Sequence, residues 1–236
     1  MKNWLKIVVA LVCMGLLLWL VWTFVAFQIV ITGHDKEPEL RPGDHVLVSR
    51  WSYGLRWPME SLFGLHRTAP SLPRTGQFIA FNDPSDTTVA VISRRPLSVG
   101  QCAALPGDTV WLEWHGPNDR AVANPVRYPF VVPGRGLRIQ VQPWNAALLA
   151  NTLQRHEGRQ LFWDGSNLRN DQGARVVEVA FSQDYIWVEA RAMSGIYDSR
   201  VYGFVPQSHL VGRLLCITYG SPLSSDRVLV PVKRFE

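Results

Sequence analysis

The sequence predicts a mainly β domain that follows one N-terminal transmembrane helix. Residues 7–27 contain no charged side chain, and the rest of the 236-residue chain carries short apolar runs rich in β-branched and aromatic residues. Turn residues such as Pro42-Gly43-Asp44 separate these runs, which is the pattern of short strands joined by tight turns. With 47% hydrophobic residues, the chain can bury a core and is not disordered.

The N-terminal apolar segment has the length of a membrane anchor. A helix of about 20 residues rises about 30 Å, the thickness of a bilayer core. A cleaved signal peptide would have a shorter apolar stretch and a small-x-small site, and the sequence shows neither as far as Val30. We therefore expect residues 7–31 to form a retained, single-pass anchor in the cytoplasmic (inner) membrane. Lys2 and Lys6 place residues 1–6 in the cytoplasm and the C-terminal domain on the extracytoplasmic side.

The runs beyond the anchor predict individual strands and one helix. Strands are expected at residues 45–48, 77–81, 88–92, 109–114, 176–181, 185–189 and 213–219. Residues 144–155 instead predict a short helix, because Leu148, Leu149 and Leu153 fall on one face. Asn145 is expected to cap the start of this helix.

Charge and cysteine content exclude several classes of function. The formal charge is +5, and lysine occurs only at Lys2, Lys6, Lys36 and Lys233. Without a lysine-rich block, nucleic acid is not an expected partner. Cys13, Cys102 and Cys216 form no CxxC pair, so we expect no metal site and no cofactor. Cys102 and Cys216 are expected to be either two buried thiols or one disulfide.

An aromatic stretch close behind the anchor predicts a surface that rests on the membrane. Trp51, Trp57 and Phe63 are interleaved with arginines at positions 50, 56 and 67. Tryptophan and arginine together suit the lipid headgroup layer. The alternative is an ordinary core segment whose arginines point outward. The lipid bilayer is therefore an expected partner.

Three motifs, in this order behind one N-terminal anchor, resemble those of type I signal peptidases, the membrane-anchored serine proteases that remove signal peptides. Residues 37–48 (EPELRPGDHVLV) resemble the family's Ser-Met-x-Pro-Thr-Leu stretch and the Gly-Asp and strand that follow it. Residues 102–110 (CAALPGDTV) resemble the Lys-Arg-x-x-Gly-Leu-Pro-Gly-Asp box. Residues 198–206 (DSRVYGFVP) resemble the Asp-Ser-Arg-x-x-Gly-x-Val-Pro box.

This resemblance implies a signal-peptidase-like β domain. Its core is expected at residues 32–115 and 176–236, with an inserted β-rich subdomain and a short helix at 116–175. In the family, a lysine kept neutral by its pocket takes the proton from the nucleophilic serine.

The residues on which this catalysis depends are replaced. Counted from the motifs, the serine position holds Asp35 and the lysine position holds Gly100. The positions that support them hold Gly33 and Ile196. Asp198 and Arg200 remain, and they resemble the family's structural ion pair. The resemblance therefore implies a member that has lost the Ser/Lys dyad and has no catalytic residue intact.

Other arrangements for catalysis are incomplete in the sequence. Lys36 and His34 lie beside Asp35, and Thr32 would need a loop that is three residues longer. Guanidinium is a poor base, so Arg94 and Arg95 do not replace the lysine. An aspartic dyad would need Asp35 to share a proton with Asp44 or Asp198.

The sequence thus predicts a catalytically inactive, signal-peptidase-like membrane protein of the export pathway. We expect it to bind signal peptides or to act as a partner of an active signal peptidase, since binding of an extended peptide uses backbone groups and does not need the dyad. One alternative is an active type I signal peptidase with an unrecognised nucleophile. Another is a structural membrane protein in which bulky side chains fill the former site.

Overall fold

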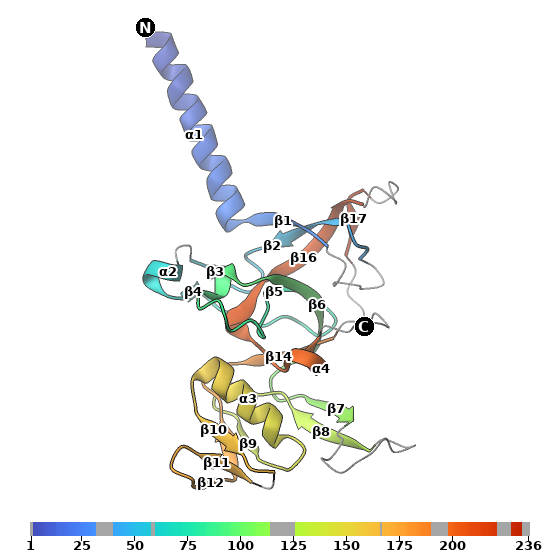
Figure 1. Ribbon diagram of the computed structural model, residues 1–236. Coiled ribbons are helices and arrows are strands. Elements are labelled where there is room, and N and C mark those ends of the chain that lie inside the picture. Colours follow the sequence, from blue (N-terminus) through green and yellow to red (C-terminus); the bar gives the residue numbers. More distant parts are fainter. Residues whose placement is uncertain are drawn as a thin grey trace.

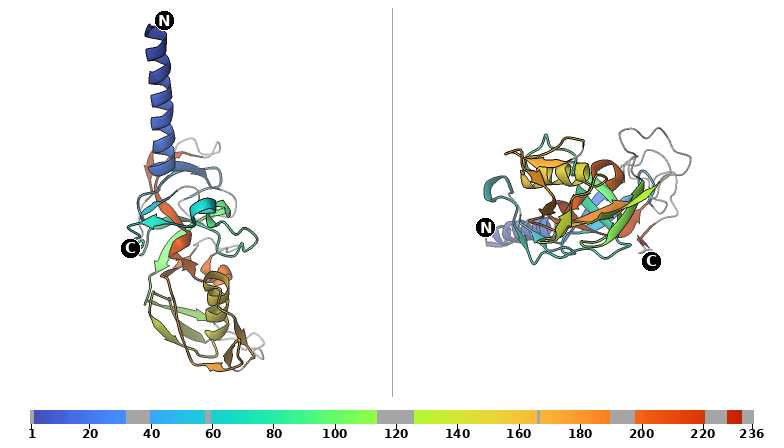
Figure 2. Two further views of the ribbon diagram at one scale, coloured as in Figure 1. Left: turned by 90° about the vertical axis from the view of Figure 1, so that its left-hand side faces the viewer. Right: turned by 90° about the horizontal axis from the view of Figure 1, so that it is seen from below.

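The computed structural model describes residues 2–31, 40–57, 60–113, 126–165, 167–189, 198–220 and 228–232. Helix α1 (Lys2–Phe24) projects from one end, a large sheet forms the centre, and a smaller body of short strands with helix α3 (Ala146–Glu157) lies at the other end (Figure 1). The left-hand view of Figure 2 shows the same order along the molecule. The fold is mainly β, as the sequence predicts.

The apolar N-terminal segment divides into a helix and a strand. After α1 ends at Phe24, β1 (Ala26–Val30) pairs antiparallel with β2 (His45–Ser49) along its whole length. Phe27 and Ile29 pack against the core, whereas Gln28 and Val30 are exposed, which is the alternation of a half-buried strand. The prediction of a continuous anchor over residues 7–31 is therefore wrong after Phe24, because pairing with β2 fixes an extended backbone there.

The apolar side chains of α1 lie on the surface. Residues 16–20 are consecutive, all apolar and all exposed, so they present apolar surface in every direction around the helix. Judged by length and apolar content together, no helix in the part of the chain that the structure describes is able to cross a membrane. The predicted transmembrane span is thus not confirmed.

The large sheet has the order β1-β2-β16-β5-β6-β14-β15, and its neighbouring strands are antiparallel. Its remaining strands are β5 (Phe78–Asn82), β6 (Leu97–Ala104), β14 (Tyr185–Glu189), β15 (Val205–Pro206) and β16 (Leu210–Tyr219), and β17 (Val230–Pro231) pairs with β16. Phe78 and Ala80 belong to one buried cluster, while Ile79 and Phe81 belong to another. Because successive residues of β5 face opposite sides, the sheet is covered on both faces.

Short elements connect these strands and lie beside them. They are β3 (Leu55–Arg56), α2 (Glu60–Phe63), β4 (Arg67–Thr68), the 3-10 turn η1 (Ile92–Arg94), α4 (Ser199–Tyr202) and the 3-10 turn η2 (Gln207–His209). β3 pairs with β4, so the chain from β3 through α2 to β4 folds back on itself.

One strand prediction is wrong, and one strand of the central sheet was not predicted. Residues 88–92 form no strand, because side-chain bonds hold this segment in turns. Asp86 accepts from the backbone N of Thr88, and Glu60 accepts from the backbone N of Ile92 and of Ser93. Conversely, β6 was not expected, although it pairs with β5 and β14 on its two sides. Its sequence, LSVGQCAA, has weak β-propensity, so its place between two strands decides its conformation.

The smaller body consists of three small sheets and α3. Its strands are β7 (Thr109–Glu113), β8 (Arg127–Val131), β9 (Arg138–Gln140), β10 (Leu161–Trp163), β11 (Leu168–Asn170), β12 (Arg175–Val176) and β13 (Glu178–Ala180). β7 pairs with β8, β9 with β13, and β11 lies between β10 and β12. Leu149 and Leu153 of α3 are buried in a cluster with Val132, Val179 and Trp187.

The short helix predicted at 144–155 is confirmed as α3, but its expected cap is not. The Asn145 side chain makes no cap bond; its Oδ1 accepts from the backbone N of Gln142, and its Nδ2 donates to the carbonyl of Gln140. Strand pairing also moves the expected boundaries of the insert, since β7 and β13 lie outside 116–175 and yet pair within the smaller body.

Candidate functional site

The position predicted to correspond to the family's lysine, Gly100, lies in the middle of the central sheet. Gly100 is a buried residue of β6, where it pairs with Ile79 of β5, and its neighbours Gln101 and Cys102 pair with Glu189 and Val188 of β14. A Cβ built on Gly100 would overlap Cγ1 of Val188, whereas its next neighbours are at ordinary distances of 3.6 and 3.8 Å. Position 100 therefore carries no amine, and Val188 occupies the direction in which a side chain would leave the backbone.

The other predicted positions of the dyad cannot be compared with Gly100. Asp35, Gly33 and Ile196 lie outside the described residues, as do Thr32, His34 and Lys36. The prediction that Asp35 stands at the nucleophile position thus stays a prediction. Lysine is absent from the sequence between residues 40 and 232, so the described part of the β domain supplies no amine base.

Ser208 and His209 form a hydrogen bond, but the histidine donates its proton to the serine and so is not placed to accept the serine's proton. Nε2 of His209 lies 3.2 Å from NH1 of Arg95, and Nδ1 lies 3.2 Å from Oγ of Ser208. Arginine can only donate, so Nε2 accepts and Nδ1 carries the proton, which it donates to the serine. Burial, with contributions from His156 and Arg95, lowers the pKa of His209 to about 2. His209 is therefore a poor base for Ser208.

Asp44, Asp198 and Arg95, considered as alternative catalytic groups, form hydrogen bonds or ion pairs with other groups. The buried Asp44 accepts from the backbone N of Arg41 at 2.9 Å. Asp198 lies 2.6 Å from NH2 of Arg200 and also accepts from its backbone N at 2.9 Å, so its charge is balanced by a cation rather than shared with a second carboxylate. Nε of Arg95 donates to the carbonyl of Val89 at 2.9 Å, and Arg94 is exposed in η1.

The segment that contains Asp198 and Arg200 supports β14. Asp198 caps α4 through the backbone N of Arg200, and the buried Ser199 accepts from the backbone N of Val188 at 2.9 Å. The short helix α4 thus holds β14, the strand whose residue Val188 covers Gly100. Sequence reasoning found Asp198 and Arg200 through their motif, but it missed Val188, for which no signal exists in the sequence. It also missed the contact of Ser199.

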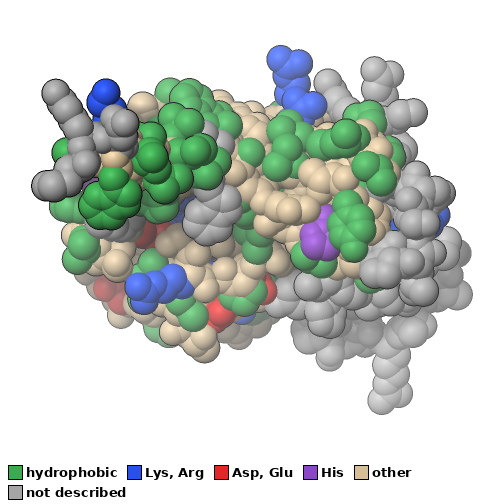
Figure 3. All heavy atoms as spheres, turned by 90° about the horizontal axis from the view of Figure 1, so that it is seen from above, with side chains coloured by type: hydrophobic (Ala, Val, Ile, Leu, Met, Phe, Trp, Pro, Cys, Tyr) green, Lys and Arg blue, Asp and Glu red, His purple; other side chains and the backbone are tan. Residues whose placement is uncertain are grey.

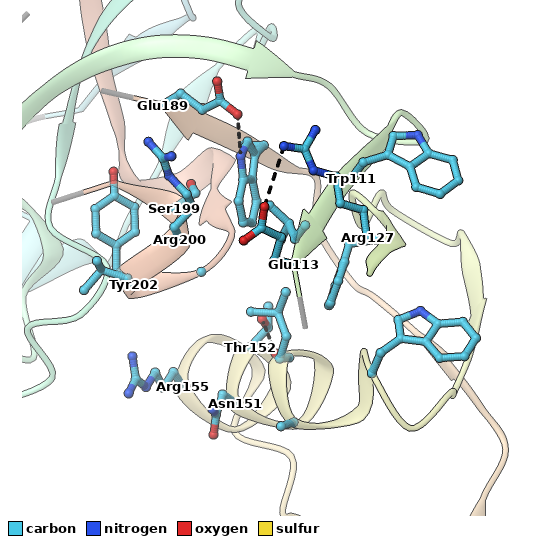
Figure 4. A pocket seen from close by; sticks show the side chains of 18 of the residues that line it. Trp111, Glu113, Arg127, Asn151, Thr152, Arg155, Glu189, Ser199, Arg200 and Tyr202 are labelled. Atoms are coloured by element: carbon cyan, nitrogen blue, oxygen red, sulfur yellow. Dashed lines mark hydrogen bonds and ion pairs between the residues drawn. The ribbon is translucent and has the colours of Figure 1, made fainter. Parts of the chain in front are cut away.

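A cleft of about 600 Å³ opens beside α4 and β14. Figure 4 shows Asn151 and Arg155 of α3 on one side, Arg200 and Tyr202 of α4 across from them, and Trp111 with the pair Glu113 and Arg127 on the β7–β8 hairpin. Glu113 and Arg127 form an ion pair of 3.6 Å, and Glu189 accepts from Nε1 of Trp187 at 3.3 Å. This volume lies in the usual range of ligand clefts, about 300–1,000 Å³.

The aromatic stretch predicted to rest on a membrane is exposed. The exposed fractions of Trp51, Trp57 and Phe63 are 60%, 58% and 65%. The interleaved Arg56 shows only 10% of its side chain to solvent, so a core segment with outward arginines is the wrong interpretation. Seen from the side of α1, hydrophobic side chains cover much of the described surface (Figure 3). Contact of this surface with lipid stays a prediction.

The three cysteines are free thiols. Cys102 is buried on β6 beside β14, and burial raises the pKa of its thiol to about 12. Of the two possibilities for Cys102 and Cys216, the structure therefore contains two separate thiols, of which Cys216 is partly exposed.

The sequence model described as "Signal peptidase, peptidase S26" matches residues 1–219. The chain belongs to the S26 signal peptidase family. This membership confirms the resemblance drawn from residues 37–48, 102–110 and 198–206, and the mainly β structure agrees with it. Comparison with curated protein sequences finds no match. Signal peptidases of this family are generally membrane-associated.

Proposed function

We propose that this S26 signal peptidase family member binds extended exported peptides without cleaving them, alone or as a partner of an active signal peptidase. The observation that carries the proposal is the packing of Val188 on Gly100. Hydrolysis by the dyad to which this family's motifs belong needs a neutral amine at that position. Here the position has neither the amine nor the space for one.

The cleft supports the binding half of the proposal. Trp111 is 60% exposed at its edge, and tryptophan supplies a large apolar contact at low entropic cost. Arg155, Arg127 and Glu113 line the same cleft, so both apolar and charged peptide groups find complementary neighbours. A peptide can bind there through its backbone and side chains without any reaction.

The N-terminal helix supports action at a membrane. Its apolar residues face every direction, and such surface is stable only in an apolar surrounding. We propose that α1 holds the protein at the cytoplasmic membrane, with Lys2 and Lys6 on the cytoplasmic side and the β domain outside. Carbonate extraction of membranes tests this: the full chain should stay in the pellet. Release of the full chain into the supernatant would contradict the membrane placement.

Preprotein binding tests the proposed function directly. The full-length protein in detergent is titrated into a fluorescently labelled, signal-peptide-bearing preprotein, and anisotropy is recorded. Trp111→Ala should weaken binding about tenfold, the equivalent of one lost aromatic anchor. Phe162→Ala is the matched control, because Phe162 is similarly exposed (55%) but lies on β10, outside the cleft. Absence of binding, or equal losses in both variants, would overturn the proposal.

A specific observation bears on each alternative function. The structural-protein alternative predicts a filled site, and Val188 does fill the space at Gly100; the cleft of about 600 Å³ favours a binding role over it. The alternative of an active peptidase needs an unrecognised nucleophile and a base other than a lysine at position 100, which is Gly100. Measurement of preprotein cleavage decides that alternative.

A further inference from the structure

Between residues 50 and 67, large aromatic side chains are exposed and arginine side chains are at least partly buried, the reverse of the usual arrangement. Its large aromatic side chains, Trp51, Trp57 and Phe63, are exposed, whereas Arg50, Arg56 and Arg67 are partly or largely buried. Long basic side chains are rarely buried unless something pairs with them. The arginines therefore raise the question of what compensates their charge.

Two of these arginines line a cavity of about 310 Å³ that opens to the surface beside the exposed Trp57 and Ser93. We name it the arginine cavity; it is lined by Arg50, Arg56, Arg95, Glu60, Asn82 and Phe27, with further contributions from Trp57, Ser93, Leu97 and Val211. The lining comes from β1, β3, α2, β5, η1, β6 and β16 and from the residues that follow β2, β3 and η1. Phe27 lies on β1, directly after α1, so the cavity sits at the end of the β domain from which α1 emerges.

Cationic groups outnumber anionic ones in this lining. Three guanidinium groups face a single carboxylate, that of Glu60. Both oxygens of Glu60 are already in use: Oε1 accepts from the backbone N of Ile92 at 2.8 Å, and Oε2 accepts from Ser93 at 2.9 Å. The distance from Oε2 to NH2 of Arg56 is 3.5 Å, which is long for a charge-assisted bond. The positive charge of the cavity is therefore only partly balanced.

The cavity also leaves donors unused. Nε of Arg50 and Nε of Arg56 are buried and have no hydrogen-bond partner among the described residues. NH1 of Arg56 is held by Oδ1 of Asn82 at 2.8 Å, and the guanidinium of Arg50 stacks over the ring of Phe27 at 4.2 Å. The two side chains are thus fixed in place with donors unsatisfied, which is costly unless a ligand accepts them.

Burial and mutual repulsion make the positive charges of the arginines in this region costly. Burial, together with repulsion from Arg56, lowers the pKa of Arg67 to about 10, and burial lowers the pKa of Arg56 as well. Arg67 donates to the carbonyls of Tyr53, Gly54 and Leu210, and no carboxylate among the described residues forms an ion pair with it. An anion in the cavity would relieve the mutual repulsion of these cations.

We propose that the arginine cavity binds a phosphate group. A tetrahedral oxyanion accepts several donors from guanidinium groups, which suit phosphate in geometry and charge. The volume is small among ligand pockets, so it accommodates a phosphate with few attached atoms. The phosphate comes either from an anionic phospholipid headgroup or from free phosphate. The lipid source rests on the proposed membrane placement of α1, whereas the phosphate site itself does not.

The experiment uses the full-length protein in detergent micelles and in nanodiscs. Binding of inorganic phosphate is measured by calorimetric titration at constant ionic strength, with chloride as the reference salt. In parallel, thermal unfolding is compared in nanodiscs of phosphatidylcholine alone and of phosphatidylcholine with phosphatidylglycerol. Phosphate should bind, or phosphatidylglycerol should raise the melting temperature. Response to phosphate alone identifies free phosphate as the source, and response to phosphatidylglycerol alone identifies the headgroup.

Matched variants separate a site from general electrostatics. Arg50→Gln removes one cation from the cavity and should weaken phosphate affinity about tenfold or more, as the loss of a charged partner predicts. Arg135→Gln removes the same charge from an exposed residue outside the cavity and should change nothing. Ser93→Asp is a second variant, at an exposed lining residue, whose carboxylate should compete with the phosphate. No response in either medium, or equal losses in Arg50→Gln and Arg135→Gln, would overturn the proposal.

Discussion

Replacement of Gly100 by alanine is the sharpest test of how the predicted lysine position is filled. The added Cβ would lie closer than 3.0 Å to Cγ1 of Val188, a separation that real Cβ atoms essentially never show, whereas carbon atoms pack best at about 3.5–4.0 Å. β6 is paired on both sides, so its backbone has little freedom to retreat. Such overpacking costs about 1–3 kcal/mol.

The matching change removes the obstacle. Val188→Ala deletes Cγ1 and leaves a small cavity, at a cost of about 1–3 kcal/mol. In the double variant the alanine at 100 occupies the space vacated by the valine, so the loss of stability should fall short of the sum of the two single losses by about 1–2 kcal/mol.

Chemical unfolding followed by tryptophan fluorescence measures these free energies. The buried Trp187 precedes Val188 in β14 and reports on the same strand. Ala80→Gly in β5, at a buried site in another cluster, is the control and should be additive with Val188→Ala. Additivity of Gly100→Ala with Val188→Ala would refute the argument that Val188 fills the position.

Two further predictions concern buried charge. Burial lowers the pKa of His209 to about 2 and that of His156 to about 4. Both stay neutral in the folded state while the unfolded chain gains protons below pH 6.5. Their contribution to stability is therefore complete above about pH 6.5 and is lost as the pH falls, toward 4 for His156 and toward 2 for His209, by roughly 1–2 kcal/mol for each at pH 5; thermal melts at pH 7 and pH 5 measure it. Arg200→Gln leaves the buried Asp198 carboxylate with a weaker partner and should cost about 1–3 kcal/mol, whereas Arg138→Gln, which breaks an exposed pair, should cost less than about 1 kcal/mol; urea unfolding compares the two.

Each of these predictions has a clear contrary result. A melting temperature that is unchanged between pH 7 and pH 5, or an acid loss that His209→Gln leaves undiminished, would contradict the protonation argument. For the ion pairs, equal costs for Arg200→Gln and Arg138→Gln would mean that the burial of Asp198 does not matter.

The sequence predicted the parts of the fold whose patterns are local. The strands expected at 45–48, 77–81, 185–189 and 213–219 correspond to β2, β5, β14 and β16, and the apolar face at Leu149 and Leu153 predicted α3. The strand predicted at 88–92 does not form, because Glu60, far away in the sequence, accepts hydrogen bonds from the backbone N of Ile92 and of Ser93 and thereby holds the segment in turns. The predicted end of the anchor is wrong because four of the five residues of β1 are apolar, so that Gln28 alone marks the alternation of a strand and the segment continues the apolar run of α1.

The candidate site was only half predictable for the same reason. The motif predicted the pair of Asp198 and Arg200, which the structure contains, whereas the assignment of Gly100 to the lysine position stays a prediction from the spacing of Pro106-Gly107-Asp108. The packing of Val188 on Gly100 and the bond from its backbone N to Ser199 depend on the register of β14 against β6 and on the fold of α4. Such contacts between distant segments leave no trace in residue spacing, so only the structure shows them.

Cleavage of a preprotein by the purified full-length protein in detergent tests the central claim most directly. An intact S26 signal peptidase is measured beside it, and Asp35→Ala serves as the control variant. We predict no product above background while the preprotein remains bound. Cleavage at the small-x-small site of the preprotein would contradict the account; if Asp35→Ala then stayed active, the working residue would lie elsewhere, and Thr32 would be changed next.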